Sequence, residues 1–97
     1  MESALRIPAD HPAYSGHFPG RPILPGVVIL AEAIAAVAQA HARAVEAWSV
    51  ASVKFLHPVA PGTALILAHT ALDGGAVRFE VRASDRVVAA GTLLPRS

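Results

Sequence analysis

The sequence predicts one α+β domain, residues 1–97, in which an antiparallel sheet wraps around one long helix. Residues 27 to about 47 contain no glycine or proline and are rich in alanine, which favours a single helix. After Trp48 apolar and polar residues alternate instead, which is typical of strands with one buried and one wet face. A long helix followed by consecutive strands indicates an α+β fold rather than alternating helices and parallel strands.

Short apolar runs separated by turn residues mark the expected strands. The segments 73–75 (Asp-Gly-Gly) and 84–85 (Ser-Asp) are predicted to be hairpin turns. In the strand between them the apolar residues at 77, 79 and 81 should face the core, and the charged residues between them should face water. The expected strands are residues 50–56, 63–72, 76–83 and 86–94, with a short first strand at residues 5–7.

The predicted helix has three kinds of surface. Its polar stripe, which we expect to face solvent, is formed by Glu32, Gln39, Arg43 and Glu46. The apolar stripe opposite is formed by Leu30, Ile34, Val37 and His41. The flank between them carries small residues suited to close approach by a sheet or a partner helix: Ala31, Ala35, Ala38 and Ala42.

The composition is unusually apolar for a small domain. Hydrophobic residues make up 54% of the 97 residues and charged residues only 15%, against roughly 25% charged in an ordinary domain. A domain this short leaves much of its surface exposed, so the surplus indicates a ligand tunnel or another subunit. A membrane span over residues 22–42 is disfavoured, because Glu32 would lie at its centre and Pro25-Gly26 would interrupt it.

Charge and residue usage exclude several other classes. The net charge is +1 and no basic run occurs, so no nucleic-acid partner is expected. The chain has no cysteine, and its histidines lack metal-ligand spacing, so no metal site or cofactor is expected. The first residues lack the features of a signal peptide, so we expect a cytoplasmic protein.

One loop carries the most specific signal. Residues 16–27 read GHFPGRPILPGV and closely resemble the signature loop of the 3-hydroxyacyl-[acyl-carrier-protein] dehydratases of fatty acid biosynthesis. A second landmark, Val-Lys-Phe at 53–55, Pro-Val at 58–59 and Pro-Gly at 61–62, resembles the same family at the expected distance after the helix. The resemblance implies the hotdog fold, in which the sheet wraps around the helix.

The chemistry of that family explains two of these residues. Eliminating water from a 3-hydroxyacyl thioester requires a base for the C2 proton, an acid for the leaving hydroxyl and donors for the enolate oxygen. His17 titrates in the range of a base, and Gly26 opens the helix, where free N–H groups and the helix dipole favour an oxyanion. The resemblance implies these same two roles, and Phe18, Pro25 and Val27 are expected beside them at the substrate. The alternative for His17 is a loop histidine that hydrogen-bonds a backbone carbonyl.

The acid is where the sequence departs from the family. The family places Glu or Asp five residues after the Pro-Gly pair, and this position is Ala31 here; the family's later glutamine corresponds to Ala35. Glu32 is adjacent, but one residue on a helix is a rotation of about 100°. Glu32 is therefore a candidate acid only if the helix start shifts or bulges. The alternative is an ordinary solvated carboxylate.

Three functions follow from these observations. The first is a dehydratase that acts on acyl-carrier-protein or coenzyme A thioesters. The second is a non-catalytic subunit that binds acyl thioesters and receives its acid from a partner chain, and the third is a hotdog thioesterase. In the family each site lies at a dimer interface, so the resemblance implies a homodimer or a heterodimer with another hotdog subunit.

Overall fold

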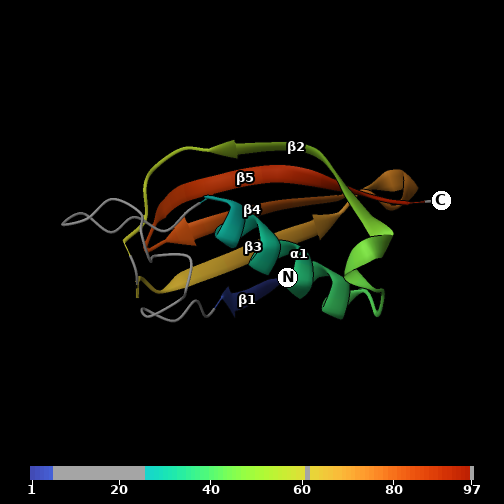
Figure 1. The fold of residues 1–97 in the computed structure, drawn as a ribbon, viewed down its shortest axis with the longest axis horizontal. Helices are drawn as coiled ribbons and strands as arrows, with labels where there is room; N and C mark the ends of the chain where they lie inside the picture. Colours follow the sequence, from blue (N-terminus) through green and yellow to red (C-terminus); the bar gives the residue numbers. More distant parts are fainter. Residues whose placement is uncertain (6–25, 61, 97) are drawn as a thin grey trace.

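The computed structural model describes residues 1–5, 26–60 and 62–96. Their helices and strands follow the order expected from the sequence, and the chain folds as a sheet with one helix (Figure 1). Two short 3-10 turns, η2 at Val45–Ala47 and η3 at Asp73–Gly75, connect the larger elements. The main elements are β1 (Glu2–Leu5), α1 (Gly26–Ala40), β2 (Trp48–Phe55), β3 (Leu65–Ala71), β4 (Val77–Ala83) and β5 (Arg86–Pro95).

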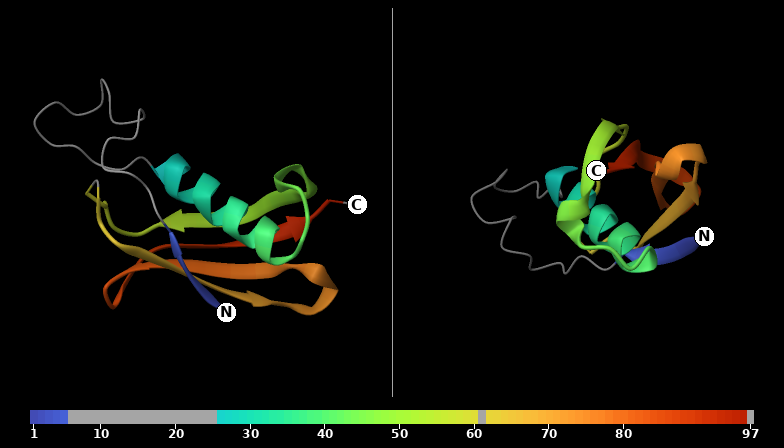
Figure 2. Two further views of the ribbon diagram at one scale, coloured as in Figure 1. Left: turned by 90° about the horizontal axis from the view of Figure 1, so that it is seen from below. Right: turned by 90° about the vertical axis from the view of Figure 1, so that its right-hand side faces the viewer.

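The strands form one antiparallel sheet in the order β1-β3-β4-β5-β2. Consecutive strands β3, β4 and β5 pair as a meander, whereas β2 crosses to the far edge and pairs with β5. The helix α1 lies across one face of this sheet, and the sheet curves around it (Figure 2). The predicted α+β arrangement of a sheet wrapped around one helix is confirmed.

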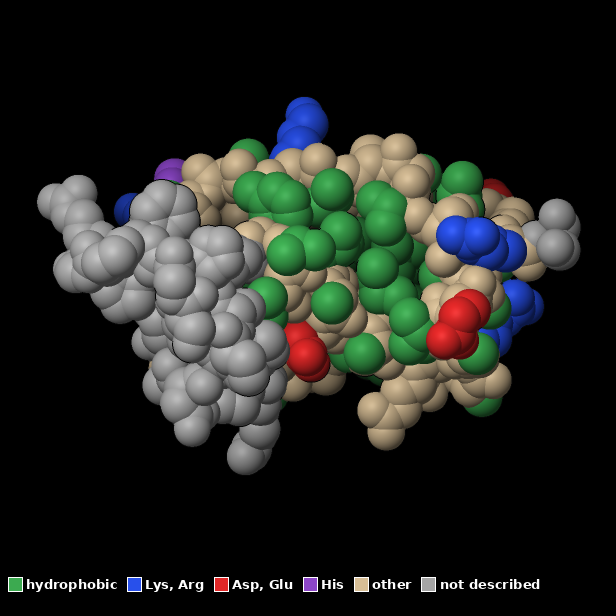
Figure 3. Space-filling view, viewed as in Figure 1, with side chains coloured by type: hydrophobic (Ala, Val, Ile, Leu, Met, Phe, Trp, Pro, Cys, Tyr) green, Lys and Arg blue, Asp and Glu red, His purple; other side chains and the backbone are tan. Residues whose placement is uncertain are grey.

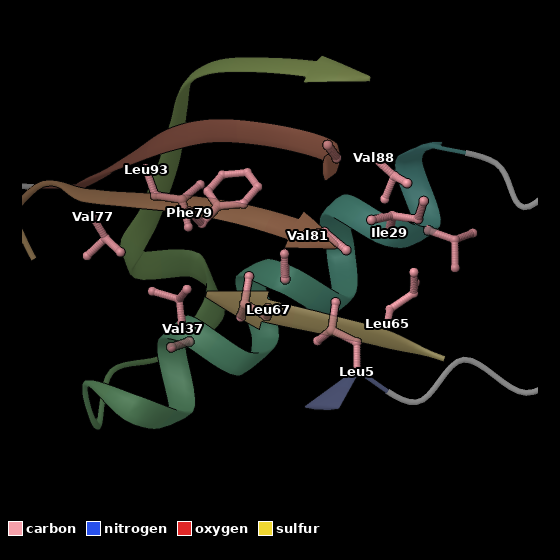
Figure 4. Close-up of a cluster of buried hydrophobic side chains, with 14 of the residues drawn as sticks. Leu5, Ile29, Val37, Leu65, Leu67, Val77, Phe79, Val81, Val88 and Leu93 are labelled. Carbon is pink, nitrogen blue, oxygen red and sulfur yellow. The ribbon is translucent and has the colours of Figure 1, made fainter. Parts of the chain in front are cut away.

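The core lies between α1 and the inner face of the sheet (Figure 4). On β4 the side chains of Val77, Phe79 and Val81 are buried there, and the charged residues between them point to the other face, as the alternation predicted. On α1 the residues Ile29, Ala33 and Val37 recur every four positions and face the same core. The buried stripe of the helix is therefore rotated slightly from the expected one. Ala33 is fully buried, whereas Leu30 and Ile34, which were expected in the stripe, are only partly buried at the border of the core.

The helix ends earlier than the sequence predicts. It stops at Ala40 because Ala42 adopts a left-handed conformation with φ of 53°, and the Arg43 N–H donates to the Ala38 carbonyl over 2.9 Å. This closing hydrogen bond is typical of a helix C-terminus that ends in a left-handed residue. Arg43 and Glu46 thus lie beyond the helix and do not extend the polar stripe.

The first strand also differs from the expectation. It covers Glu2–Leu5 and so begins before the expected residues 5–7, of which 6 and 7 lie outside the described residues; its register places Leu5 opposite Leu65 of β3. Pairing with β3 buries Leu5, and this long-range contact fixes the position of the strand. A Glu2–Arg82 ion pair on the outer face connects β1 to β4.

Apolar side chains remain exposed on the face that carries α1. Figure 3 shows hydrophobic side chains gathered there, over the helix and toward β2. Val27 is 69% exposed, and Ala31 and Ala35 are exposed on the same side of α1. At the sheet edge, Val50 and Phe55 of β2 are 41% and 49% exposed. Part of the apolar surplus seen in the composition is therefore on the surface of the single chain.

Candidate active site

A cavity of about 380 Å³ opens where α1 begins, beside the end of β2. Helix residues form one side of it, and the end of β2 with the following segment forms the other. Its lining is apolar apart from one histidine, and it consists of Gly26, Val27, Ile29, Phe55, Leu56, His57 and Pro58. A mostly apolar cavity with few polar groups is the usual form of a small-molecule site.

Gly26 allows the two sides of this cavity to approach closely. A Cβ atom at this position would lie 2.9 Å from Cδ1 and Cε1 of Phe55, closer than two carbon atoms pack. The phenyl ring therefore lies directly against the first residue of the helix. The N–H groups of a first helical turn have no partner within the helix, so backbone donors are available beside the ring.

The structure places the predicted substrate-binding residues as follows. Gly26 and Val27 come together in the cavity at the start of α1. His17, Phe18 and Pro25 lie outside the described residues, so their roles stay predictions.

The two candidate acid positions lie on different sides of α1. Ala31 is exposed on the apolar surface of the helix, whereas Glu32 is half-buried at its flank. Glu32 is not one of the described residues that line the cavity at Gly26. Although Glu32 is next to Ala31 in the sequence, its side chain does not take the place that a carboxylate at position 31 would have. The role of Glu32 as the acid stays a prediction.

His57 is not among the residues that the sequence predicts for the site. In the structure it lies in the cavity lining together with Gly26. The signal that points to it is its place inside the second landmark, directly after the Val-Lys-Phe segment and before Pro58-Val59.

A second group of aromatic side chains lies at the other end of α1. The ring of His41 packs edge-on against Trp48 at 5.5 Å between centroids, and its centroid lies 6.0 Å from that of His69. His41 is half-buried there, but it directly follows the end of α1 instead of lying on the predicted apolar stripe of the helix. Among residues 1–5, 26–60 and 62–96 no group of three or more side chains is arranged to hold a metal ion.

The stability of the fold is expected to fall below neutral pH because of His69. This side chain is buried, and burial, the Met1 amino group and His41 together lower the pKa of His69 below its ordinary value of 6.5. Below about pH 6.5 the unfolded chain therefore binds a proton that the folded chain does not. The contribution of neutral His69 to stability is fully present above about pH 6.5 and is lost as the pH falls from there through the lowered pKa of the folded state. Urea unfolding between pH 5 and 8 measures this loss.

A variant pair isolates this contribution. His69→Gln should flatten the pH dependence, whereas Thr70→Ala, at the exposed next position of β3, should keep the wild-type slope. An equally steep slope in His69→Gln would show that other groups cause the loss.

Solved structures identify the fold. The chain matches the dehydratase heterocomplex ApeI:P from Xenorhabdus doucetiae with a TM-score of 0.70 and 24% identity over 99% of this chain and 86% of that one. It matches an uncharacterized protein from Erwinia carotovora subsp. atroseptica with a TM-score of 0.68 and 27% identity over 97% and 82% of the two chains. A mutant of the fluoroacetyl-CoA-specific thioesterase FlK gives a TM-score of 0.69 at 14% identity, covering 98% and 88%. The fold is the hotdog fold of dehydratases and thioesterases.

The sequence places the chain within one family of that fold. The model of the ApeI-like family, described as ApeI dehydratase, matches residues 1–92, and the chain belongs to this family. The 3-hydroxyacyl-[acyl-carrier-protein] dehydratase FabZ of Verminephrobacter eiseniae is 35% identical over 97 residues, which covers 87% of this chain and 64% of the relative. FabZ of Wolbachia sp. subsp. Drosophila simulans is 41% identical over 78 residues, covering 69% and 52%. The chain thus spans between half and two thirds of these relatives.

No helix in the described ranges is long and apolar enough to cross a membrane. The helix α1 has 15 residues, begins at Gly26 and contains Glu32.

Proposed function

We propose that this chain eliminates water from a 3-hydroxyacyl thioester to give a 2-enoyl thioester. The observation that carries this proposal is the cavity that opens at Gly26, the last glycine of the GHFPGRPILPGV segment. Phe55 lies against that glycine, so a flat apolar surface adjoins the backbone donors of the first helical turn. The family and the curated dehydratases related to the chain support the same reaction class.

In the proposed mechanism His17 takes the proton from C2 of the substrate. The negative charge then develops on the thioester oxygen, and the Gly26 N–H stabilises it by a hydrogen bond. The C2–C3 double bond forms as the bond from C3 to the hydroxyl breaks, and the hydroxyl leaves as water after receiving a proton. Phe18, Pro25 and Val27 contact the acyl chain. An acyl-carrier-protein thioester is the proposed substrate, and the coenzyme A thioester is its simpler analogue.

We further propose that a second hotdog subunit covers the exposed apolar face. Within the described residues β2 pairs only with β5, so its other edge has unpaired backbone groups. Val27 and Ala31 of α1 are exposed on the apolar face, and Val50 is exposed on β2. A partner placed against this edge would bury these side chains and bring its own helix near the site.

Ala31 favours one alternative, in which the chain is a subunit that depends on its partner. The position that carries the acid in the related enzymes is exposed alanine here, so a different subunit could supply the carboxylate. The structural neighbour from Xenorhabdus doucetiae is a dehydratase heterocomplex, which is a precedent for such an assembly.

Enoyl-thioester hydration, the reverse reaction, tests these proposals. The purified chain is mixed with a crotonyl thioester, alone and together with a carboxylate-bearing hotdog dehydratase, and the loss of enoyl absorbance is recorded. Hydration by the chain alone supports the main proposal, and hydration only in the mixture supports the dependent subunit. A Glu32→Ala variant that keeps full activity removes Glu32 as the acid. Absence of hydration under both conditions overturns the proposed function.

A further inference from the structure

The cavity at the start of α1 has one titratable side chain in its described lining. His57 lies there among Gly26, Val27 and the apolar side chains that form the rest of the surface. The proposed reaction needs an acid beside the substrate, and Ala31 provides none. A histidine in this place has the required chemistry, because imidazole both binds and releases a proton near neutral pH.

The backbone holds His57 between two fixed points. The Leu56 N–H donates to the carbonyl of Val88 on β5 over 2.8 Å, which continues the sheet one residue beyond β2. Val59, two residues after His57, is buried in the core with 4% exposure. Pro58 restricts the backbone of the residue before it to extended conformations. The position of His57 is therefore determined by the sheet and the core, not by a free loop.

The side chain of His57 is exposed, so water can reach it and return its proton after each reaction. Phe55, two residues earlier, lies against Gly26, which places this segment next to the proposed oxyanion donor. Glu32, in contrast, is half-buried on the flank of α1 and lies outside the described lining.

We infer that His57 is the acid of the proposed dehydration, and that it donates its proton to the departing 3-hydroxyl group. This inference rests on the proposed function. The proton of C2 passes to His17, the C2–H electron pair forms the double bond, and the C3–O bond breaks. The oxygen takes both electrons of that bond and one proton from His57, and it leaves as water. Both histidines then return to their starting states by exchanging protons with solvent.

Two reactions of the 97-residue chain separate the acid from the base. Dehydration of a 3-hydroxybutyryl pantetheine thioester needs both groups, whereas exchange of its C2 proton for deuterium in D2O needs only the base and the enolate stabilisation. His57→Asn is expected to lower the dehydration rate by about 100-fold or more. The same variant should keep C2 exchange within about threefold of the wild type. His57→Glu, which restores a group able to donate a proton, should recover part of the dehydration rate.

Lys54→Gln is the matched control. Lys54 is exposed on β2 close to His57 in sequence but is not part of the described cavity lining, so this change should leave both rates unchanged. Equal melting temperatures for all variants show that the fold is intact.

The possible failures are distinguishable. Wild-type dehydration that persists in His57→Asn overturns the role of His57 and leaves the proposed function standing. Loss of both dehydration and C2 exchange in that variant also contradicts an acid role. Activity of the wild-type chain only with a carboxylate-bearing partner assigns the acid to that partner. Absence of any dehydration or hydration by the wild-type chain, with or without a partner, overturns the proposed function itself.

Discussion

Replacing His17 with glutamine is expected to lower kcat/KM for enoyl-thioester hydration by about 100- to 10,000-fold. The physical reason is that the C2 proton of a thioester leaves slowly without a base held close to it. Glutamine preserves hydrogen bonding and much of the volume of histidine but cannot accept that proton at neutral pH. The measurement is the initial rate of hydration for the wild type and the variant at equal protein concentration.

A His11→Gln variant is the control for this experiment. His11 lies in the same stretch of sequence but outside the GHFPGRPILPGV segment, so its replacement should leave the rate unchanged. Equal losses in the two variants would indicate a general effect on folding. A fully active His17→Gln variant with native stability would remove His17 from the mechanism.

Replacing Gly91 with alanine is expected to reduce the free energy of unfolding by about 3 kcal/mol. Gly91 of β5 lies opposite Phe79 of β4, and a Cβ atom there would lie 3.0 Å from the buried phenyl ring. The same atom would overlap the backbone carbonyl of Ser52 on β2. Because a backbone atom and a fully buried ring cannot both move aside, β2 must shift away from β5. Thermal or urea unfolding measures the loss.

Gly74→Ala is the control that separates crowding from backbone conformation. Gly74 has φ of 80°, and nothing lies within 4 Å of a Cβ atom at this position. Alanine there should cost only about 1–2 kcal/mol, from the unfavourable left-handed conformation. Gly91 is not among the described glycines with positive φ. The larger loss of stability expected for Gly91→Ala would therefore come from crowding by the added Cβ atom. Unchanged unfolding of Gly91→Ala would show that β2 and β5 are less closely packed than the structure indicates.

The Gly91 variant also connects the sheet to the proposed site. The strand β2 that has to move carries Phe55 at its end, and Phe55 lies against Gly26. We therefore expect the hydration rate of Gly91→Ala to fall together with its stability.

Local patterns predicted the meander of the sheet well. The alternation around Phe79 and the turn at residues 73–75 depend on neighbours in sequence, and the structure agrees with both. The end of the helix was not predictable in the same way, because Ala42 takes a left-handed conformation that glycine usually supplies. The start of the first strand was not predictable either, because its pairing partners on β3 are 60 to 66 residues away in the chain.

The site shows the same division between local and distant information. Gly26 was predictable, because a Pro-Gly pair before a long alanine-rich segment indicates a helix start. The place of His57 was not, because it depends on β2 crossing the sheet so that its end meets the start of α1. A sequence pattern assigns His57 to the segment after a strand but does not show which helix end that segment meets.

Product analysis is the most direct test of the central claim that the chain is a dehydratase. The purified chain, with and without a hotdog partner, is incubated with a 3-hydroxyacyl pantetheine thioester, and the products are identified by mass spectrometry. The account predicts a product that has lost one water and still carries its thioester, formed reversibly. Release of free pantetheine and a 3-hydroxy acid, without any enoyl thioester, would contradict it and assign the chain to the thioesterases.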